Sequence, residues 1–287
     1  MPHRRTASSP GNLSIYRTSV GRDAVARWCR DRLDAWPLTH ERHEITVDGA
    51  VTHAVTAGHG DRTVVVVPGT NTCAAVQYPL VAALGRRCRV VAVDLPGQPG
   101  LSSGDRPPAT DRLAWYGRWL GQVIEKVTHG PVTVLGHSLG AAVALACPAP
   151  QVEQQVLLSP AGVVPLRVTP GVALAAAGWV VRRADSGSRR LLRVMHAPGN
   201  RPRAELVEWM TLVARHVRSS ADPGLLPVPD RDVRRTVAVG AADVFLPPSR
   251  LAPHVRRALG VEVRVVDDAG HFVTDERPDA VAALVDG

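Results

Sequence analysis

One serine of this chain lies in a pattern that is typical of a catalytic nucleophile. Ser138 is flanked two positions away by Gly136 and Gly140, an apolar run at 132–135 precedes this Gly-x-Ser-x-Gly motif, and an alanine-rich run at 141–145 follows it. A serine on a sharp turn between a strand and a helix has strained backbone angles and an exposed hydroxyl group. A glycine-rich turn can contain an incidental serine, but the strand and helix patterns around Ser138 favour a nucleophile.

A serine nucleophile needs a base and an acid, and candidates for both follow it in the chain. The imidazole of a histidine takes the serine proton during attack, and a carboxylate fixes the imidazole tautomer and stabilises its charge. Asp243 ends the turn after an apolar strand pattern that begins at 237, and His271 ends the turn after an alternating pattern that begins at 261. The sequence therefore predicts a triad of Ser138, Asp243 and His271, each on a turn after a strand.

Other histidines and carboxylates are weaker candidates for these roles. Surface or core-packing roles are expected for four histidines in loop or helical patterns, His129, His196, His216 and His254. His137 is next to Ser138, but on a tight turn its side chain is expected to point away from the reaction. The carboxylates that compete with Asp243 are Asp267, Asp268 and Asp275. Residues so close to His271 more often cap the next helix, so Asp243 is favoured as the acid.

An acyl-transfer site also needs donors for the negative charge that develops on the substrate oxygen. The valine run at 64–67 ends in the loop Pro68-Gly69-Thr70-Asn71. We expect an oxyanion hole formed by the backbone N–H of Leu139 and that of Thr70 or Asn71, with Asn71 also in contact with the substrate. The alternative is that this loop only turns the chain, but its position upstream of the serine turn favours the functional interpretation.

The order of these motifs resembles that of the α/β-hydrolases over nearly the whole chain. Residues 67–70 lie where the family usually has His-Gly, residues 94–102 resemble its Asp-x-x-Gly-x-x-x-Ser loop, and the turns of Ser138, Asp243 and His271 follow. Pro68 replaces the usual histidine, which alters the hydrogen bonding of the loop but not its backbone donors. Serine rather than aspartate at the nucleophile position disfavours similarity to dehalogenases and epoxide hydrolases.

Three further segments resemble a bacterial carboxylesterase-like branch of that family. These segments are Trp36-Pro37, the strand pattern at 51–53 and residues 196–200. The resemblance implies a serine hydrolase, and it implies little about the substrate.

The spacing of apolar residues predicts the elements that position these side chains. Strand patterns alternate with helical patterns at 73–84, 88–94, 109–127, 131–135, 138–147 and 152–158, and two strands at 43–47 and 51–56 read as a hairpin around Asp48-Gly49. Such alternation predicts an α/β fold, with a mostly parallel sheet of the eight-stranded type flanked by helices.

The alternation stops between 166 and 232, where helical patterns at 170–181, 189–195 and 204–218 indicate a helical cap. We therefore expect a core of residues 1–165 and 233–287, in which 1–40 form a basic tail and an amphipathic helix at 22–36 on the edge of the sheet. A cap would exclude water and shape the substrate pocket, with Trp179, Trp209 and Met210 as pocket candidates. Most other apolar residues of the cap are expected to pack against the core.

The charge of the chain does not point to nucleic acid. The formal net charge is +8 over 287 residues, but Lys126 is the only lysine, which indicates a compositional preference for arginine. No basic helix is interleaved with stacking aromatic residues, so nucleic-acid binding is not expected. Seven arginines of the cap, Arg182, Arg183, Arg189, Arg190, Arg193, Arg201 and Arg203, are interpreted as a solvated face rather than as a site for an anionic substrate or a membrane surface.

The cysteines and the apolar runs indicate no cofactor and no stable membrane insertion. Cys29, Cys73, Cys88 and Cys147 lack metal-type spacing and are expected to be free thiols, and no other cluster has metal-ligand or phosphate-cradling spacing. The amino terminus lacks a hydrophobic signal segment, and the longest apolar run, at 172–181, is too short to span a bilayer. A cytoplasmic protein without metal or cofactor, acting on a small molecule, is expected, and its oligomeric state is left open.

Together these features predict hydrolysis of an ester-type bond through an acyl-enzyme on Ser138. Three alternatives keep the same triad: cleavage of a thioester, lactone or C–C bond, transfer of the acyl group to an acceptor other than water, and a ligand sensor with slow turnover.

Overall fold

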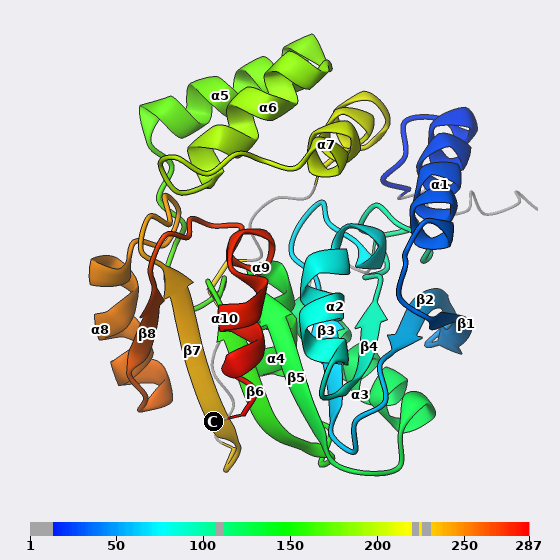
Figure 1. Cartoon of the computed structure of the whole chain (residues 1–287), viewed down its shortest axis with the longest axis vertical. Helices are drawn as coiled ribbons and strands as arrows, with labels where there is room; N and C mark the ends of the chain where they lie inside the picture. Colours follow the sequence, from blue (N-terminus) through cyan, green and yellow to red (C-terminus); the bar gives the residue numbers. More distant parts are fainter. Residues whose placement is uncertain (1–13, 107–111, 220–223, 226–230, 287) are drawn as a thin grey trace, which may run out of the picture.

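An eight-stranded sheet forms the centre of the molecule (Figure 1). The structure is a computed structural model, and it describes residues 14–106, 112–219, 224–225 and 231–286. The strands are β1 (His40–Val47), β2 (Ala50–Ala57), β3 (Thr63–Val67), β4 (Arg89–Val93), β5 (Val132–His137), β6 (Val152–Leu158), β7 (Arg234–Gly240) and β8 (Val263–Val266). Their order is β1-β2-β4-β3-β5-β6-β7-β8. The pairings β1–β2 and β2–β4 are antiparallel, and all others are parallel. The predicted fold class is confirmed.

The central strands are apolar on both faces because helices cover both sides of the sheet. Every residue of β3 is buried, and its valines alternate between two separate apolar clusters. Val64 and Val66 pack into the cluster that includes α1 (Ser19–Asp34) and α2 (Tyr78–Gly85). Val65 and Val67 pack into the cluster that includes α3 (Arg112–Val127) and α4 (Leu139–Ala146). A parallel strand buried in this way reads as a continuous hydrophobic run, which is the pattern at 64–67.

Most helices outside the β6–β7 connection cover the two faces of the sheet, but α1 lies at its end, near that connection (Figure 1). Their bounds are α1 (Ser19–Asp34), η1 (Ala74–Val76), α2 (Tyr78–Gly85), α3 (Arg112–Val127), α4 (Leu139–Ala146), α8 (Pro248–Leu259), α9 (Val273–Glu276) and α10 (Pro278–Ala283). The predicted hairpin is formed by β1 and β2, with positive φ at Asp48 (51°) and Gly49 (76°). Two-residue hairpin turns require this conformation, which Asp-Gly adopts readily.

The first helix differs from its prediction in bounds and in contacts. It begins at Ser19 and ends at Asp34, with the Thr18 hydroxyl accepting from the Gly21 N–H. Helix α1 packs mainly against η1 and the β6–β7 connection rather than on the edge of the sheet, and its Trp28 ring lies 5.0 Å from the ring of Trp209 in that connection. The tail at 1–13 and the predicted start of α3 at 109–111 lie outside the described residues.

Three helices connect β6 to β7, and we call them the α5–α7 layer. They are α5 (Pro170–Arg182), α6 (Asp185–Met195) and α7 (Ala204–His216), and they lie over the carboxyl ends of the strands (Figure 1). Part of the segment predicted as a cap, at 220–223 and 226–230, lies outside the described residues. None of the helices in the described part of the chain combines the length and the apolar character needed to cross a membrane.

Candidate active site

Ser138 lies on a strained turn between β5 and α4. Its φ of 52° and ψ of −112° are costly for a residue with a Cβ atom. The turn is possible because glycines flank it at close approaches: a Cβ on Gly136 would lie 2.4 Å from the Gly140 carbonyl oxygen, and a Cβ on Gly140 would lie 2.1 Å from the Val67 carbonyl oxygen. Strain of this kind is found where a turn presents a reactive side chain.

His271 and Asp243 form a buried pair on the turns after β8 and β7. The His271 Nδ1 lies 2.9 Å from Asp243 Oδ2. The other carboxylate oxygen, Asp243 Oδ1, accepts the backbone N–H groups of Phe245 at 2.9 Å and Leu246 at 3.0 Å. Burial alone would raise the pKa of Asp243, but the charge and hydrogen bond of His271 and the Leu246 N–H outweigh it and lower the pKa. Asp243 is therefore ionised at neutral pH and holds Nδ1 of His271 toward itself.

Ser138 and His271 line the same cavity, which has a volume of about 310 Å³. The rest of its lining is mostly apolar and comes from the α5–α7 layer and from loops at the carboxyl ends of the strands. It comprises Gly69, Thr70, Asn71, Thr72, His137, Ala161, Leu166, Val168, Val172, Ala176, Trp179, Leu191, Met195, Met210, Phe245 and Phe272. No Asp, Glu, Lys or Arg of the described residues lines this cavity.

The loop at 69–72 approaches the serine turn closely, and its hydrogen bonds distinguish Thr70 from Asn71. A Cβ on Gly69 would lie 3.3 Å from the Cβ of Ser138. The Asn71 N–H donates to Gln98 Oε1 at 3.0 Å, so this donor is already occupied. The backbone N–H groups of Thr70 and Leu139 have no acceptor among the described residues. Of the two loop N–H groups considered for the oxyanion hole, that of Thr70 is therefore the one left available.

Trp209 does not line the cavity, in contrast to the prediction. Its side chain is buried in α7 against Trp28, and its indole N–H donates to the Asn71 carbonyl oxygen at 2.7 Å. This hydrogen bond ties the 69–72 loop to α7 through the Asn71 carbonyl group. Of the other two pocket candidates, Trp179 and Met210 both line the cavity, and the Trp179 indole N–H donates to the Met210 carbonyl oxygen at 2.9 Å.

The carboxylates near His271 in the sequence have other partners. Asp275 accepts from the Arg203 guanidinium, at 2.6 Å from Nε, and lies 3.7 Å from His196 Nε2. Burial would raise the pKa of Asp275, but the hydrogen bond of His196 and the charge of Arg203 outweigh it and lower the pKa. Asp268 lies at the surface beside Arg277, and Asp267 is exposed.

His137 belongs to the site although it is not placed to act as a base. Its Nε2 lies 2.8 Å from the His271 carbonyl oxygen. A carbonyl oxygen can only accept, so Nε2 carries the proton and fixes the tautomer. Burial, and then the charge of His271, lower the pKa of His137 from 6.5 to about 3. A neutral His137 therefore anchors the backbone of His271.

Glu276 is a second anchor that sequence reasoning missed. Its Oε1 accepts the Ala197 N–H at 2.7 Å and the Asn200 side-chain amide at 2.8 Å, and its Oε2 accepts the Gly270 N–H at 2.7 Å. The His271 N–H also donates to the Met195 carbonyl oxygen at 2.7 Å. These bonds fasten the turn that carries the catalytic candidate His271 to the segment between α6 and α7.

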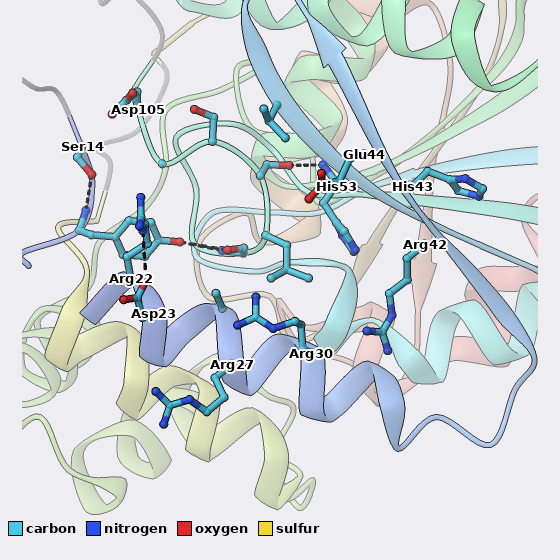
Figure 2. A pocket seen from close by; sticks show the side chains of 18 residues that line it. Ser14, Arg22, Asp23, Arg27, Arg30, Arg42, His43, Glu44, His53 and Asp105 are labelled. Atoms are coloured by element: carbon cyan, nitrogen blue, oxygen red, sulfur yellow. Dashed lines mark hydrogen bonds and ion pairs between the residues drawn. The ribbon is translucent and has the colours of Figure 1, made fainter. Parts of the chain in front are cut away.

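A larger cavity of about 730 Å³ lies between α1, β1, β2 and the loop at 100–105 (Figure 2). Arg22, Arg27, Arg30, Arg42, His43 and His53 line it together with Asp23, Glu44 and Asp105. Its buried serine is not free to act as a nucleophile, because Ser102 Oγ accepts the His53 N–H at 2.8 Å and donates to the Asp94 carbonyl oxygen at 2.7 Å. Ser138 and His271 line the smaller cavity and not this one.

Within the described residues, no group of three or more His, Cys, Asp and Glu side chains could hold a metal ion. All four cysteines are buried free thiols, and the sulfur atoms of Cys29 and Cys73 lie 3.8 Å apart. Burial raises the pKa of Cys73 well above its usual value, so this thiol is protonated at neutral pH.

Comparisons with known proteins agree with this architecture. No sequence among the curated proteins matches the chain. Among solved structures, carboxylesterase CesB of Bacillus subtilis has a TM-score of 0.73 at 19% identity, over 93% of this chain and 97% of that one. Naproxen esterase (carboxylesterase NP) of Bacillus subtilis has a TM-score of 0.74 at 21% identity, over 94% and 98%.

An N-acyl homoserine lactonase, AidH, has a TM-score of 0.66 at 17% identity, over 86% of this chain and 96% of that one. At such identities these likenesses show a shared fold. The model of the Alpha/beta hydrolase family matches residues 64–284, from β3 to α10. Because this match spans most of the sequence and includes the turns of Ser138, Asp243 and His271, the chain belongs to the alpha/beta hydrolase family.

Proposed function

We propose that this hydrolase cleaves an ester-type bond of a small, uncharged substrate through an acyl-enzyme formed on Ser138. The observation that carries the proposal is the convergence of a strained serine turn and a carboxylate-bound histidine on one apolar cavity. A serine hydroxyl needs such a base to react at neutral pH, because its own pKa is too high.

The roles in the first step follow from which atoms are already engaged. Nδ1 of His271 faces Asp243, which leaves Nε2 to take the proton of the Ser138 hydroxyl. As Oγ bonds to the substrate carbonyl carbon, negative charge develops on the carbonyl oxygen, and the N–H groups of Thr70 and Leu139 stabilise it by donating hydrogen bonds. The tetrahedral intermediate collapses by breaking the bond to the alcohol oxygen, and Nε2 returns its proton to that oxygen.

The second step repeats this chemistry with water as the nucleophile. Nε2 of His271 takes a proton from water, the hydroxide oxygen bonds to the acyl carbon, and the bond to Ser138 Oγ breaks with return of the proton. The products are a carboxylic acid and the free enzyme.

The lining of the cavity supports an apolar acyl group. The absence of charged side chains among its described lining residues disfavours a charged substrate, because a buried charge without a partner is costly. A volume of about 310 Å³ is at the lower end of the range for small-molecule pockets, which favours short and medium acyl chains.

The α5–α7 layer is proposed to act as the cap of this site. Val172, Ala176, Trp179 and Leu191 reach the cavity from α5 and α6. Covering the triad with apolar side chains excludes water and strengthens the electrostatic interactions of the transition state.

The proposal is tested with p-nitrophenyl esters of increasing acyl length. An acyl-enzyme route gives a burst of one p-nitrophenolate per active site whenever deacylation is slower than acylation, followed by steady turnover. Steady hydrolysis that is lost in Ser138→Ala is the expected result. Stoichiometric release without turnover would favour a ligand sensor, and hydrolysis retained in Ser138→Ala would exclude the proposed nucleophile.

A further inference from the structure

Helix α5 is apolar on its outer side as well as on its inner side. From Pro170 to Val181 it has no charged residue, and Val172, Ala175 and Trp179 are buried beneath it. On the outside, Leu174, Val180 and Val181 are 61%, 46% and 79% exposed. A helix that is hydrophobic all round is normally buried, so part of α5 lacks a partner in the described chain.

Exposed arginines lie at both ends of α5 and on the neighbouring α6. Arg167 precedes α5, Arg182 and Arg183 end it, and Arg189, Arg190 and Arg193 lie on the exposed side of the neighbouring α6. No carboxylate of the described residues lies within ion-pair distance of these six side chains. The one acidic residue of α5 and α6 is Asp185.

These arginines also lie outside the cavity of Ser138, so they do not bind a substrate there. The prediction that they form a solvated face explains their exposure, but it does not explain why Leu174, Val180 and Val181 are exposed between them.

We propose that the outer face of α5 and the arginines around it form a peripheral docking site for an anionic lipid surface. Leucine and valine side chains enter the boundary between headgroups and acyl chains, while guanidinium groups bind phosphate oxygens at the same depth. One-sign charge around an apolar helix is the pattern of interfacial helices.

A second copy of this chain fits the face less well. A twofold contact would bring identical surfaces together, and therefore two clusters of unpaired arginines. Like charges across an interface oppose association.

The position of the face gives docking a consequence for the site. The inner side of α5 lines the cavity of Ser138, so a lipid surface on its outer side lies one helix away from the substrate. The docking site would then deliver apolar esters from a bilayer; this consequence rests on the proposed hydrolysis, whereas docking itself does not.

Vesicle sedimentation with the whole protein tests the proposal. The probes are phosphatidylcholine vesicles with and without phosphatidylglycerol, at low and high salt. We expect binding only with phosphatidylglycerol, weakened by salt because screening reduces the attraction. Each arginine near an anionic surface contributes to the binding constant by roughly five-fold, so Arg189→Gln with Arg193→Gln should reduce it by roughly 25-fold.

The apolar contribution is tested with Leu174→Ser and Val181→Ser together, which should abolish sedimentation. Val20→Ser on α1, where the valine is 74% exposed, and Arg257→Gln on α8 are the matched controls and should bind like the unaltered protein. Hydrolysis of soluble p-nitrophenyl acetate should stay unchanged in all these variants, since none of the altered residues lines the cavity.

Absent binding, equal binding to vesicles without phosphatidylglycerol, or equal losses in the control variants would overturn the proposal. A dimer in the absence of lipid that dissociates in Leu174→Ser would also overturn it and would assign the face to a second copy. A protein that binds vesicles but hydrolyses no ester would refute the proposed function and leave the docking site intact.

Discussion

Removal of the Glu276 carboxylate should displace the imidazole of His271 although His271 itself is unaltered. Three donors converge on this carboxylate: the N–H groups of Gly270 and Ala197, and the side-chain amide of Asn200. Gly270 directly precedes His271, so the bond to its N–H bears on the position of the imidazole. We expect Glu276→Ala to lower both stability and turnover.

The magnitude follows from the number and exposure of these bonds. Hydrogen bonds to a charged group contribute about 1.5–3 kcal/mol each when water cannot replace them. Glu276 is half-buried, so water replaces part of each bond, and about 1 kcal/mol per bond is a reasonable value. Loss of all three gives about 3 kcal/mol for Glu276→Ala, and loss of one gives about 1 kcal/mol for Glu276→Gln.

The effect on catalysis comes from displacement of the imidazole. A misplacement of about 1 Å at a reacting group can cost about 100-fold in rate. We therefore expect kcat of Glu276→Ala to fall by about 10- to 100-fold at a temperature where the variant is folded.

The assay combines urea denaturation with ester hydrolysis at saturating substrate. Glu262→Ala is the matched control, because Glu262 also makes two short bonds, to Arg256, but is exposed and does not line the cavity. It should retain stability and kcat. Unchanged kcat in Glu276→Ala despite lower stability would show that the three hydrogen bonds to Glu276 stabilise the fold without positioning His271. Unchanged stability would refute the contribution assigned to these hydrogen bonds.

The other predictions concern the pocket, the acid and the buried histidine. Trp179→Ala should change the discrimination between short and long acyl esters, because the indole lines the cavity. The ratio of their kcat/KM values, converted to a free energy, should shift by roughly 1–3 kcal/mol. An equal loss of kcat/KM for all esters would make Trp179 a packing residue. Trp209→Ala should instead lower kcat for every ester, acetate included, because it supports the 69–72 loop; an unchanged acetate rate would contradict this role. Asp243→Asn should keep a native circular dichroism spectrum and lower kcat on the order of 10⁴-fold, and a loss below tenfold would mean that another group orients the base. The pKa of His137 is about 3 in the folded protein against 6.5 in the unfolded chain, so only the unfolded chain binds its proton between these values. As the pH falls from 6.5 toward 3, the free energy of unfolding should therefore decrease by up to about 1.4 kcal/mol per pH unit. His137→Gln should show a smaller slope in denaturant titrations.

Local patterns were sufficient to predict most elements of the fold. The valine run at 64–67 and the Asp48-Gly49 turn correspond to β3 and to the β1–β2 hairpin. The helical patterns at 170–181, 189–195 and 204–218 correspond closely to α5, α6 and α7. These patterns depend on side-chain periodicity and turn chemistry, which the sequence displays directly.

Contacts between distant segments could not be predicted in this way. Helical spacing placed Trp209 on the apolar face of its helix, but it did not reveal that this face meets Trp28 and Asn71 rather than the cavity. Glu276 reads as an ordinary acidic residue in the first turn of a helix, and its partners Ala197 and Asn200 are more than 70 residues away. A single sequence shows no signal for such pairings.

The central claim is that Ser138 is the nucleophile, and covalent labelling tests it most directly. A fluorophosphonate probe is incubated with the protein and with Ser138→Ala, and the modified peptide is identified by mass spectrometry. The claim predicts one phosphonate per chain, on Ser138, with neither labelling nor esterase turnover in the variant. Labelling of another serine, or equal labelling and turnover in Ser138→Ala, would contradict it.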